Sequence, residues 1–167
     1  MAENKILVPL TIPVKSVVKG YLIYTLGKNL RIKQNTLPGI LLNAFLHKER
    51  NDNKYDYEPL SYDDEVTLMI EEWQMNRYGY VMNITQIRRF NTAITYQVYE
   101  LLFCRLDAFR KYEFKKGIMK KEIMNFMTEY NFLEYGMSYE NCKKQYQRHR
   151  DSRKDKLREL QIHLPFA

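Results

Sequence analysis

The stretch NITQIRRFNTAITYQVYELLFCRLDAFR, residues 83–110, decides the fold class, because its helical period is the clearest in the chain. Asn83 is suited to cap the helix. One apolar stripe follows, formed by Ile87, Phe90, Ile94, Val98, Leu101, Leu102 and Phe109. A helix of about 28 residues is a rod of roughly 42 Å, which is long for a small domain. We therefore predict that this helix is the structural spine.

The region before the spine, residues 1–82, is expected to mix strand and helix. The segment LVPLTIPV, residues 7–14, is rich in branched apolar residues, but its two prolines remove ladder donors, so it reads as an edge strand. Apolar residues at helical spacing predict a helix over 16–26, with Gly27 as its stop. A second short helix is predicted from Leu37-Pro38-Gly39 through Leu46.

Residues 61–75 fit two periods. Val66, Met69, Ile70 and Trp73 allow a helix that Ser61 and Asp64 could cap, and a strand over 66–70 is equally allowed. We favour the strand, followed by a turn at Tyr78-Gly79-Tyr80. The polar, tyrosine-rich residues 51–58 predict a loop.

After the spine and a basic linker, together residues 83–116, the region 117–167 predicts a pair of helices. The first follows Gly117 and is amphipathic, and Ser138 can cap the second. The inward stripe of the second helix is Tyr139, Cys142, Tyr146 and His149. Two helices joined by a glycine-containing turn, the second of them basic, are the parts of a helix-turn-helix DNA reader.

The basic side of the last helix carries the candidate DNA-binding residues, which are Lys143, Lys144, Gln147, Arg148, Arg150, Arg153 and Lys154. Arg can fork onto guanine or phosphate, Gln can pair with adenine, and Lys supplies charge to phosphates. Residues 138–158 hold eight basic residues against three acidic ones. The alternative is a solvated face that binds nothing.

The net charge of +7 is concentrated in the same part of the chain. Residues 105–158 carry 15 Lys and Arg against 8 Asp and Glu, while the remaining residues carry 12 of each. Such a segregated charge attracts polyanions, and nucleic acid is the leading partner class.

The run IMNFMTEYNFLEYGMSYENCKKQYQRHR, residues 123–150, resembles the C-terminal region of short uncharacterised proteins of Bacteroides-type bacteria and their mobile elements. The YQR-x-R core of those proteins matches Tyr146, Gln147, Arg148 and Arg150. The segment VPLTIPV, the helix start with its Tyr-Leu pair, second Tyr and Gly, and the later helix are similar in outline, so the resemblance extends over most of the chain. The resemblance implies a role in genome or mobile-element biology, with DNA binding, and it implies no catalytic activity.

A weaker resemblance is to ribbon-helix-helix repressors, in which paired strands of a dimer read the major groove. It implies that Thr11, Pro13 and Lys15 face DNA. The two prolines and the long connection from Gly27 to Leu37 depart from that pattern, and we favour an ordinary edge strand.

Other classes of site find little support in the sequence. No run of about 18 apolar residues is present, so we expect no membrane span. Cys104 and Cys142 are expected to be reduced, with Cys104 a buried hydrophobe, and His47, His149 and His163 lack metal spacing. The acidic residues at 63–65 and 71–72 could suggest a magnesium site, but adjacent carboxylates are usually solvated. We expect no cofactor, no metal and no catalytic site.

The sequence therefore predicts an α+β fold that is mainly helical, with a mixed N-terminal half, a long central helix and a helix-turn-helix-like C-terminal pair. Its predicted function is binding of double-stranded DNA in the cytoplasm, as a regulatory or accessory protein of a mobile element. The rival from another class is a non-catalytic protein-interaction or structural module that builds an oligomer. A homodimer is compatible with either function.

Overall fold

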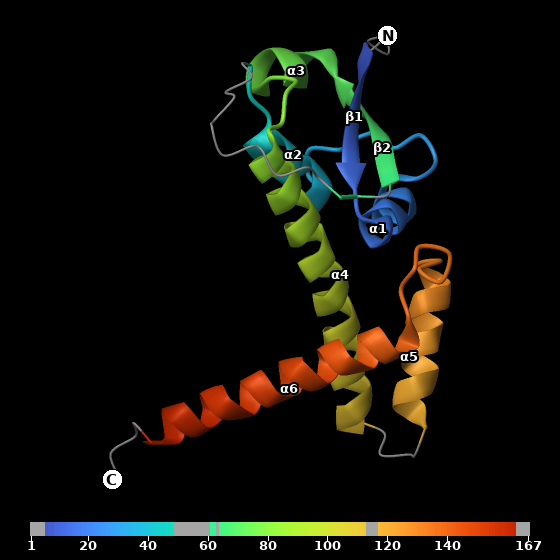
Figure 1. The fold of residues 1–167 in the computed structure, drawn as a ribbon, viewed down its shortest axis with the longest axis vertical. Helices are drawn as coiled ribbons and strands as arrows, with labels where there is room; N and C mark the ends of the chain where they lie inside the picture. The colour runs from blue at the N-terminus through green and yellow to red at the C-terminus, as the bar shows by residue number, and fades with distance from the viewer. Residues whose placement is uncertain (1–5, 49–60, 63, 113–116, 163–167) are drawn as a thin grey trace. The chain divides into compact units, whose positions relative to one another are not determined.

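The computed structural model describes residues 6–48, 61–62, 64–112 and 117–162, without the side chains of 111–112 and 155–162. The predicted loop at 51–58, the linker residues 113–116 and His163 lie outside these ranges. The fold is α+β and mainly helical, as predicted (Figure 1). In chain order the elements are β1 Leu7–Val14, α1 Ser16–Leu26, α2 Leu37–Phe45, β2 Asp64–Glu71, α3 Glu72–Tyr78, α4 Ile84–Tyr112, α5 Ile118–Glu129 and α6 Tyr139–Ile162.

The chain divides into two compact units, Met1–Tyr96 and Gln97–Ala167. Unit 1 holds the two strands and the three short helices, and unit 2 holds α5 and α6. The boundary falls inside α4, so this one helix contributes side chains to both cores. The expected spine is therefore present, and each half of it belongs to a different unit.

The two strands of unit 1 form an antiparallel ladder that pairs Leu7 with Glu71 and Val14 with Asp64. The Glu72 amide donates to the Ile6 carbonyl at 3.0 Å, which sets the phase of the ladder. The backbone N–H and C=O groups of even-numbered β1 residues therefore bond to β2. Those of odd-numbered residues point away from β2. Pro9 and Pro13 occupy odd positions, where a missing N–H group costs the ladder nothing.

The two edges of this sheet differ. On the far side of β2, Met69 exchanges hydrogen bonds with Leu30 and Ile32 at 3.0 and 2.9 Å. The outer side of β1 lacks donors at both prolines, which makes it a poor template for another strand. The edge-strand prediction is confirmed, whereas a ribbon-helix-helix dimer needs strand pairing between two copies.

The region between β2 and α4 differs from the prediction in one respect. The strand favoured over 66–70 is confirmed, but a helix, α3, follows it directly before Gly79. Glu71 and Gln74 cap α3 reciprocally, and this local capping box was not recognised in the sequence. At Gly79, with φ +109°, a Cβ would lie 2.0 Å from the carbonyl carbon of His47, so only glycine fits.

The helix α4 begins with the predicted cap. Asn83 Oδ1 accepts from the Gln86 amide at 2.9 Å, and Gln86 Oε1 accepts from the Asn83 amide at 2.7 Å. The stripe expected from the sequence is buried at Ile87, Phe90, Ile94, Val98 and Leu102, while Leu101 and Phe109 are half-buried.

The prediction for one α4 residue, Cys104, is wrong. Cys104 is exposed, contrary to the prediction that it is a buried hydrophobe. The inward face of this part of α4 instead contains Phe103 and Leu106. The two apolar neighbours Leu101 and Leu102 made position 104 look internal, but it points away from the side that unit 2 covers.

A buried amide, Asn91, fastens α4 to the end of β1. Its Oδ1 accepts from the Lys15 amide at 2.8 Å, and its Nδ2 donates to the carbonyls of Pro13 at 3.2 Å and Ile87 at 2.9 Å. The side chain is fully buried. Two of these three bonds satisfy backbone groups where β1 passes into α1.

We expect Asn91→Ala to lower the free energy of unfolding by about 2–3 kcal/mol, because it leaves buried backbone groups without partners. Thr92→Ala changes the next residue of the same helix, which is exposed, and should change stability by less than ~0.5 kcal/mol. Urea denaturation of both variants followed by circular dichroism tests this. Equal effects of the two substitutions would show that Asn91 has no such role.

Candidate nucleic-acid interface

The segment that joins α5 to α6 is built from local turns. Asn131 and Gly136 take positive φ values of 55° and 72°, and Phe132 between them is fully buried, with its ring 5.7 Å from that of Phe126. Ser138 Oγ accepts from the Asn141 amide at 3.2 Å, which confirms the predicted cap. The joining residues 130–138 form a longer connection than the three or four residues of a helix-turn-helix turn.

The inward side of α6 lies against the C-terminal half of α4 (Figure 1). Cys142 and Tyr146 are buried, as the sequence pattern predicts. The ring of Phe103 on α4 lies 5.9 Å from the Tyr146 ring and 4.5 Å from the His149 ring. Burial raises the pKa of the Cys142 thiol to about 11, so this thiol stays neutral.

One carboxylate of α4, Asp107, holds three side chains of α6. It accepts from the Tyr146 hydroxyl at 2.7 Å and from the Arg153 guanidinium at 2.7 Å, and His149 Nε2 lies 3.9 Å away. Burial, with the nearby Asp107 carboxylate, raises the pKa of Tyr146 to about 12. We call Asp107, Tyr146, His149 and Arg153 the Asp107 cluster, and it sets the rotation of α6 about its own axis.

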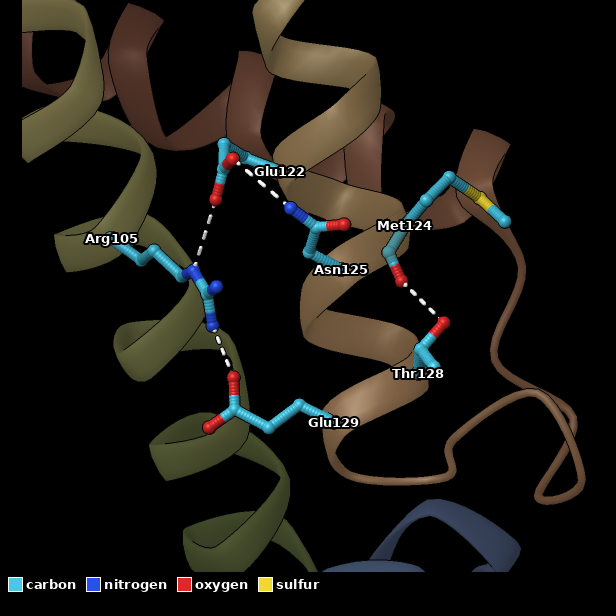
Figure 2. Close-up of polar contacts among 6 residues, drawn as sticks. All are labelled: Arg105, Glu122, Met124, Asn125, Thr128 and Glu129. Carbon is cyan, nitrogen blue, oxygen red and sulfur yellow. Dashed lines mark hydrogen bonds and ion pairs between the residues drawn. The ribbon is translucent and has the colours of Figure 1, made fainter.

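The helix α5 is fastened to α4 by a second polar group, which Figure 2 shows. Arg105 of α4 donates to Glu122 at 3.3 Å and to Glu129 at 2.5 Å, two carboxylates that lie two turns apart on α5. Asn125 donates to the other oxygen of Glu122 at 3.1 Å. Because Glu122 is buried, this fork also compensates a charge that would otherwise be costly.

The seven candidate residues do not all project outward. Lys143, Lys144, Gln147, Arg148 and Lys154 are exposed along α6. Arg153 is also exposed, but its guanidinium is held by Asp107. Arg150 is half-buried, and its Nε is enclosed without a hydrogen-bond partner among the described residues. Arg150 and Arg153 therefore lie toward the anchored side of α6, not on the open side where the sequence pattern put them.

Acidic residues neutralise part of the open side. Lys143 pairs with Glu140 at 3.8 Å, and Lys154 pairs with Asp151 at 3.9 Å, each three residues along the helix. Within the part of the chain that the structure describes, Lys144 and Arg148 form no ion pair. These two residues, four apart, thus carry the uncompensated charge of the open side.

Sequence reasoning missed a contact between the two C-terminal helices. Tyr139, assigned to the inward stripe, is half-buried, and ammonium groups from both helices lie near its ring. Lys120 Nζ of α5 is 6.0 Å from the ring centroid, and Lys143 Nζ of α6 is 5.9 Å away. No spacing within one helix could reveal this contact, because it depends on where α6 crosses α5.

Two of the acidic residues considered for magnesium, Asp64 and Glu71, have cationic partners in unit 1. Asp64 accepts from Lys19 at 2.7 Å, and this bond holds the pKa of Asp64 below its usual value. Glu71 accepts from Arg31 at 2.9 Å and from the Trp73 indole at 2.6 Å. Asp63 lies outside the described residues. In the described ranges, no three His, Cys, Asp or Glu side chains gather closely enough to hold a metal ion.

No family model, curated protein or solved structure matches the chain. Among the described residues, no helix combines the length and the apolar character that crossing a membrane requires.

We expect Tyr146→Ala to destabilise unit 2 by about 3 kcal/mol, because it empties a buried aromatic site and removes one partner of Asp107. Tyr146→Phe keeps the ring and should cost about 1 kcal/mol. Denaturant unfolding of both variants measures the difference. An unchanged stability in Tyr146→Ala would contradict the anchoring of α6 on α4.

The raised pKa of Tyr146, beside Asp107, predicts that the free energy of unfolding falls at alkaline pH. The Tyr146 hydroxyl ionises near pH 10 in the unfolded chain and near pH 12 in the folded one. Its stabilising contribution is complete below about pH 10 and is lost as the pH rises toward 12, because the unfolded state loses the proton first. Tyr146→Phe should make the fall in stability over this window shallower than in the wild-type protein.

Proposed function

We propose that this chain is a cytoplasmic, non-catalytic protein that binds double-stranded DNA through the open side of α6. The observation that carries the proposal is the division of α6 into two sides. Its inward side is occupied by packing and by the Asp107 cluster, whereas Lys144 and Arg148 project from its open side without an ion pair among the described residues. Charges held on a rigid, anchored helix are suited to a regular array of phosphates.

The residues of α6 divide the work by position. Arg148 and Lys144 meet the phosphate backbone first, because their charge is not neutralised by a carboxylate. Gln147 lies between them in sequence and is exposed, and its amide can accept from and donate to a base edge in the major groove. Lys143 and Lys154 contribute after they exchange a weak surface ion pair for a phosphate. Arg150 and Arg153 act from the anchored side.

The biological setting is part of the proposal and rests on the resemblance of residues 123–150 to mobile-element proteins. That resemblance supports a regulatory or accessory role on DNA. We further propose that any homodimer forms without strand pairing through the outer side of β1. Pro9 and Pro13 lie at the ladder positions whose backbone points outward, and neither has an N–H group to donate to another strand. The rival function, a protein-interaction or structural module, makes the charge of α6 incidental.

Duplex binding should weaken steeply as salt rises, because cations released from the phosphates drive it. Fluorescence anisotropy of a labelled duplex across a salt series measures this dependence. We expect Arg148→Ala to lower the slope of log Kobs against log[salt] by about one unit. No binding at low salt would remove the proposal and favour the rival.

A matched control separates a specific face from net charge alone. Arg89→Ala removes the same charge from an exposed position of α4 in unit 1. It should leave both the affinity and the salt slope nearly unchanged. If Arg89→Ala weakens binding as much as Arg148→Ala, the protein binds by overall charge and α6 is no dedicated interface.

Base reading and phosphate contact should separate on α6. Lys154→Ala is expected to weaken binding to all duplexes alike, while Gln147→Ala should cost ~1–3 kcal/mol on a preferred sequence and little on random duplexes. Titration of both variants against selected and random duplexes measures this. Equal losses on every duplex would make α6 a phosphate clamp without base readout.

A further inference from the structure

The place where α6 crosses α5 combines an aromatic ring with two ammonium groups. We call Lys120, Tyr139 and Lys143 the lysine–tyrosine corner. Both Nζ atoms lie about 6 Å from the ring centroid, at 6.0 Å for Lys120 and 5.9 Å for Lys143. The three residues come from two helices, so the corner exists only when α5 and α6 are packed together.

The surroundings of the corner are strongly positive. Lys121 and Lys144, the next residues along α5 and α6, are both exposed. Of the carboxylates that the structure describes, Glu140 is the one that pairs with these lysines, and it lies 3.8 Å from Lys143. Glu122 offers little compensation, because Arg105 and Asn125 already bind its two oxygens. Two ammonium groups, those of Lys120 and Lys143, thus lie at the Tyr139 ring, and Lys121 and Lys144 add exposed positive charge to the same two helices.

The lysine contacts with the ring are replaceable. A cation at about 6 Å from an aromatic ring that water reaches is held by roughly 0.5–1 kcal/mol, and Tyr139 is only half-buried. A phosphate is a better partner for an ammonium group, because the hydrogen bond between them is charge-assisted. When phosphates arrive, both lysines can turn toward them and leave the face of Tyr139 to a base. A nucleotide brings the base and the phosphate together, so it matches both parts of the corner.

We infer that the lysine–tyrosine corner binds an unpaired nucleotide next to the duplex held by α6, with the base stacked on Tyr139. This inference rests on the proposed DNA binding. Inside a duplex each base is stacked on its neighbours and offers only its edges to the grooves, so away from the duplex ends the Tyr139 ring has no base face to contact. Unpaired strands are held by aromatic rings within positive grooves. The preferred DNA therefore carries a single-stranded extension.

The test compares three labelled probes with the full-length protein by anisotropy: a blunt duplex, the same duplex with a short thymidine overhang, and a thymidine oligonucleotide. We expect the overhang to improve affinity about tenfold over the blunt duplex, the size that stacking of one base provides. Tyr139→Ala should abolish this preference, whereas Tyr139→Phe, which keeps the ring, should retain it.

Two further variants control for folding and for general charge. Lys120→Gln lies on α5 and leaves the α6 side of the corner intact, so a reduced overhang preference in this variant cannot come from loss of the Tyr139 ring. Arg148→Ala should weaken binding of the blunt and overhang duplexes by the same factor. Thermal unfolding by circular dichroism confirms that each variant is folded.

The outcomes separate this inference from the proposed function. If the wild-type protein binds blunt and overhang duplexes equally, or if Tyr139→Ala keeps the preference, the corner is no nucleotide site although duplex binding stands. If only the oligonucleotide binds, and Tyr139→Ala abolishes that binding, the corner is supported and the duplex proposal fails. If no probe binds at low salt, both are overturned.

Discussion

Burial of one face of α4 is the constraint on which both units depend. The helix is continuous from Ile84 to Tyr112, and its apolar positions enter two cores in turn. In unit 1 the buried amide of Asn91 joins it to the end of β1. In unit 2 Phe103 and Asp107 provide the surface on which α6 is seated. Each core needs its half of α4, because a single helix or a two-stranded sheet cannot cover its own apolar side and must pack on another element.

The chemistry available to α6 follows from how it is held. Asp107 accepts from Tyr146 and Arg153, so one rotation of α6 is favoured and the opposite side is left open. Arg153 pairs with Asp107, so its charge stabilises the orientation of α6 and is already compensated by a carboxylate. The free charge is therefore smaller than the count of basic residues. Among the described residues of the site, it remains at Lys144 and Arg148 of α6 and at Lys120 of the lysine–tyrosine corner, whereas Lys143 pairs with Glu140. Under the proposed function, this distribution of free charge, not the net charge of +7, is the feature that nucleic acid would recognise.

Much of the fold follows from local signals in the sequence. The strand at 7–14, the helices from Ser16 and Leu37, the Asn83 cap of α4 and the Ser138 cap of α6 agree with the pattern read from the chain. These features depend on periodicity and on hydrogen bonds between near neighbours, so a few adjacent residues specify them. The helix α3 was missed because its capping box at Glu71 and Gln74 directly follows a strand with no intervening turn signal.

The sequence alone determined the helices other than α3, where the positive charge is concentrated, and that Cys142 and Tyr146 face inward. Only the tertiary structure decided which basic residues remain free, because Arg153 meets a carboxylate 46 residues earlier in the chain. The same holds for Cys104, which the packing of unit 2 leaves exposed, and for Lys120, which approaches Tyr139 only where two helices cross. Periodicity specifies the side of a helix on which a residue lies, whereas the partner of that side is chosen by contacts between distant segments.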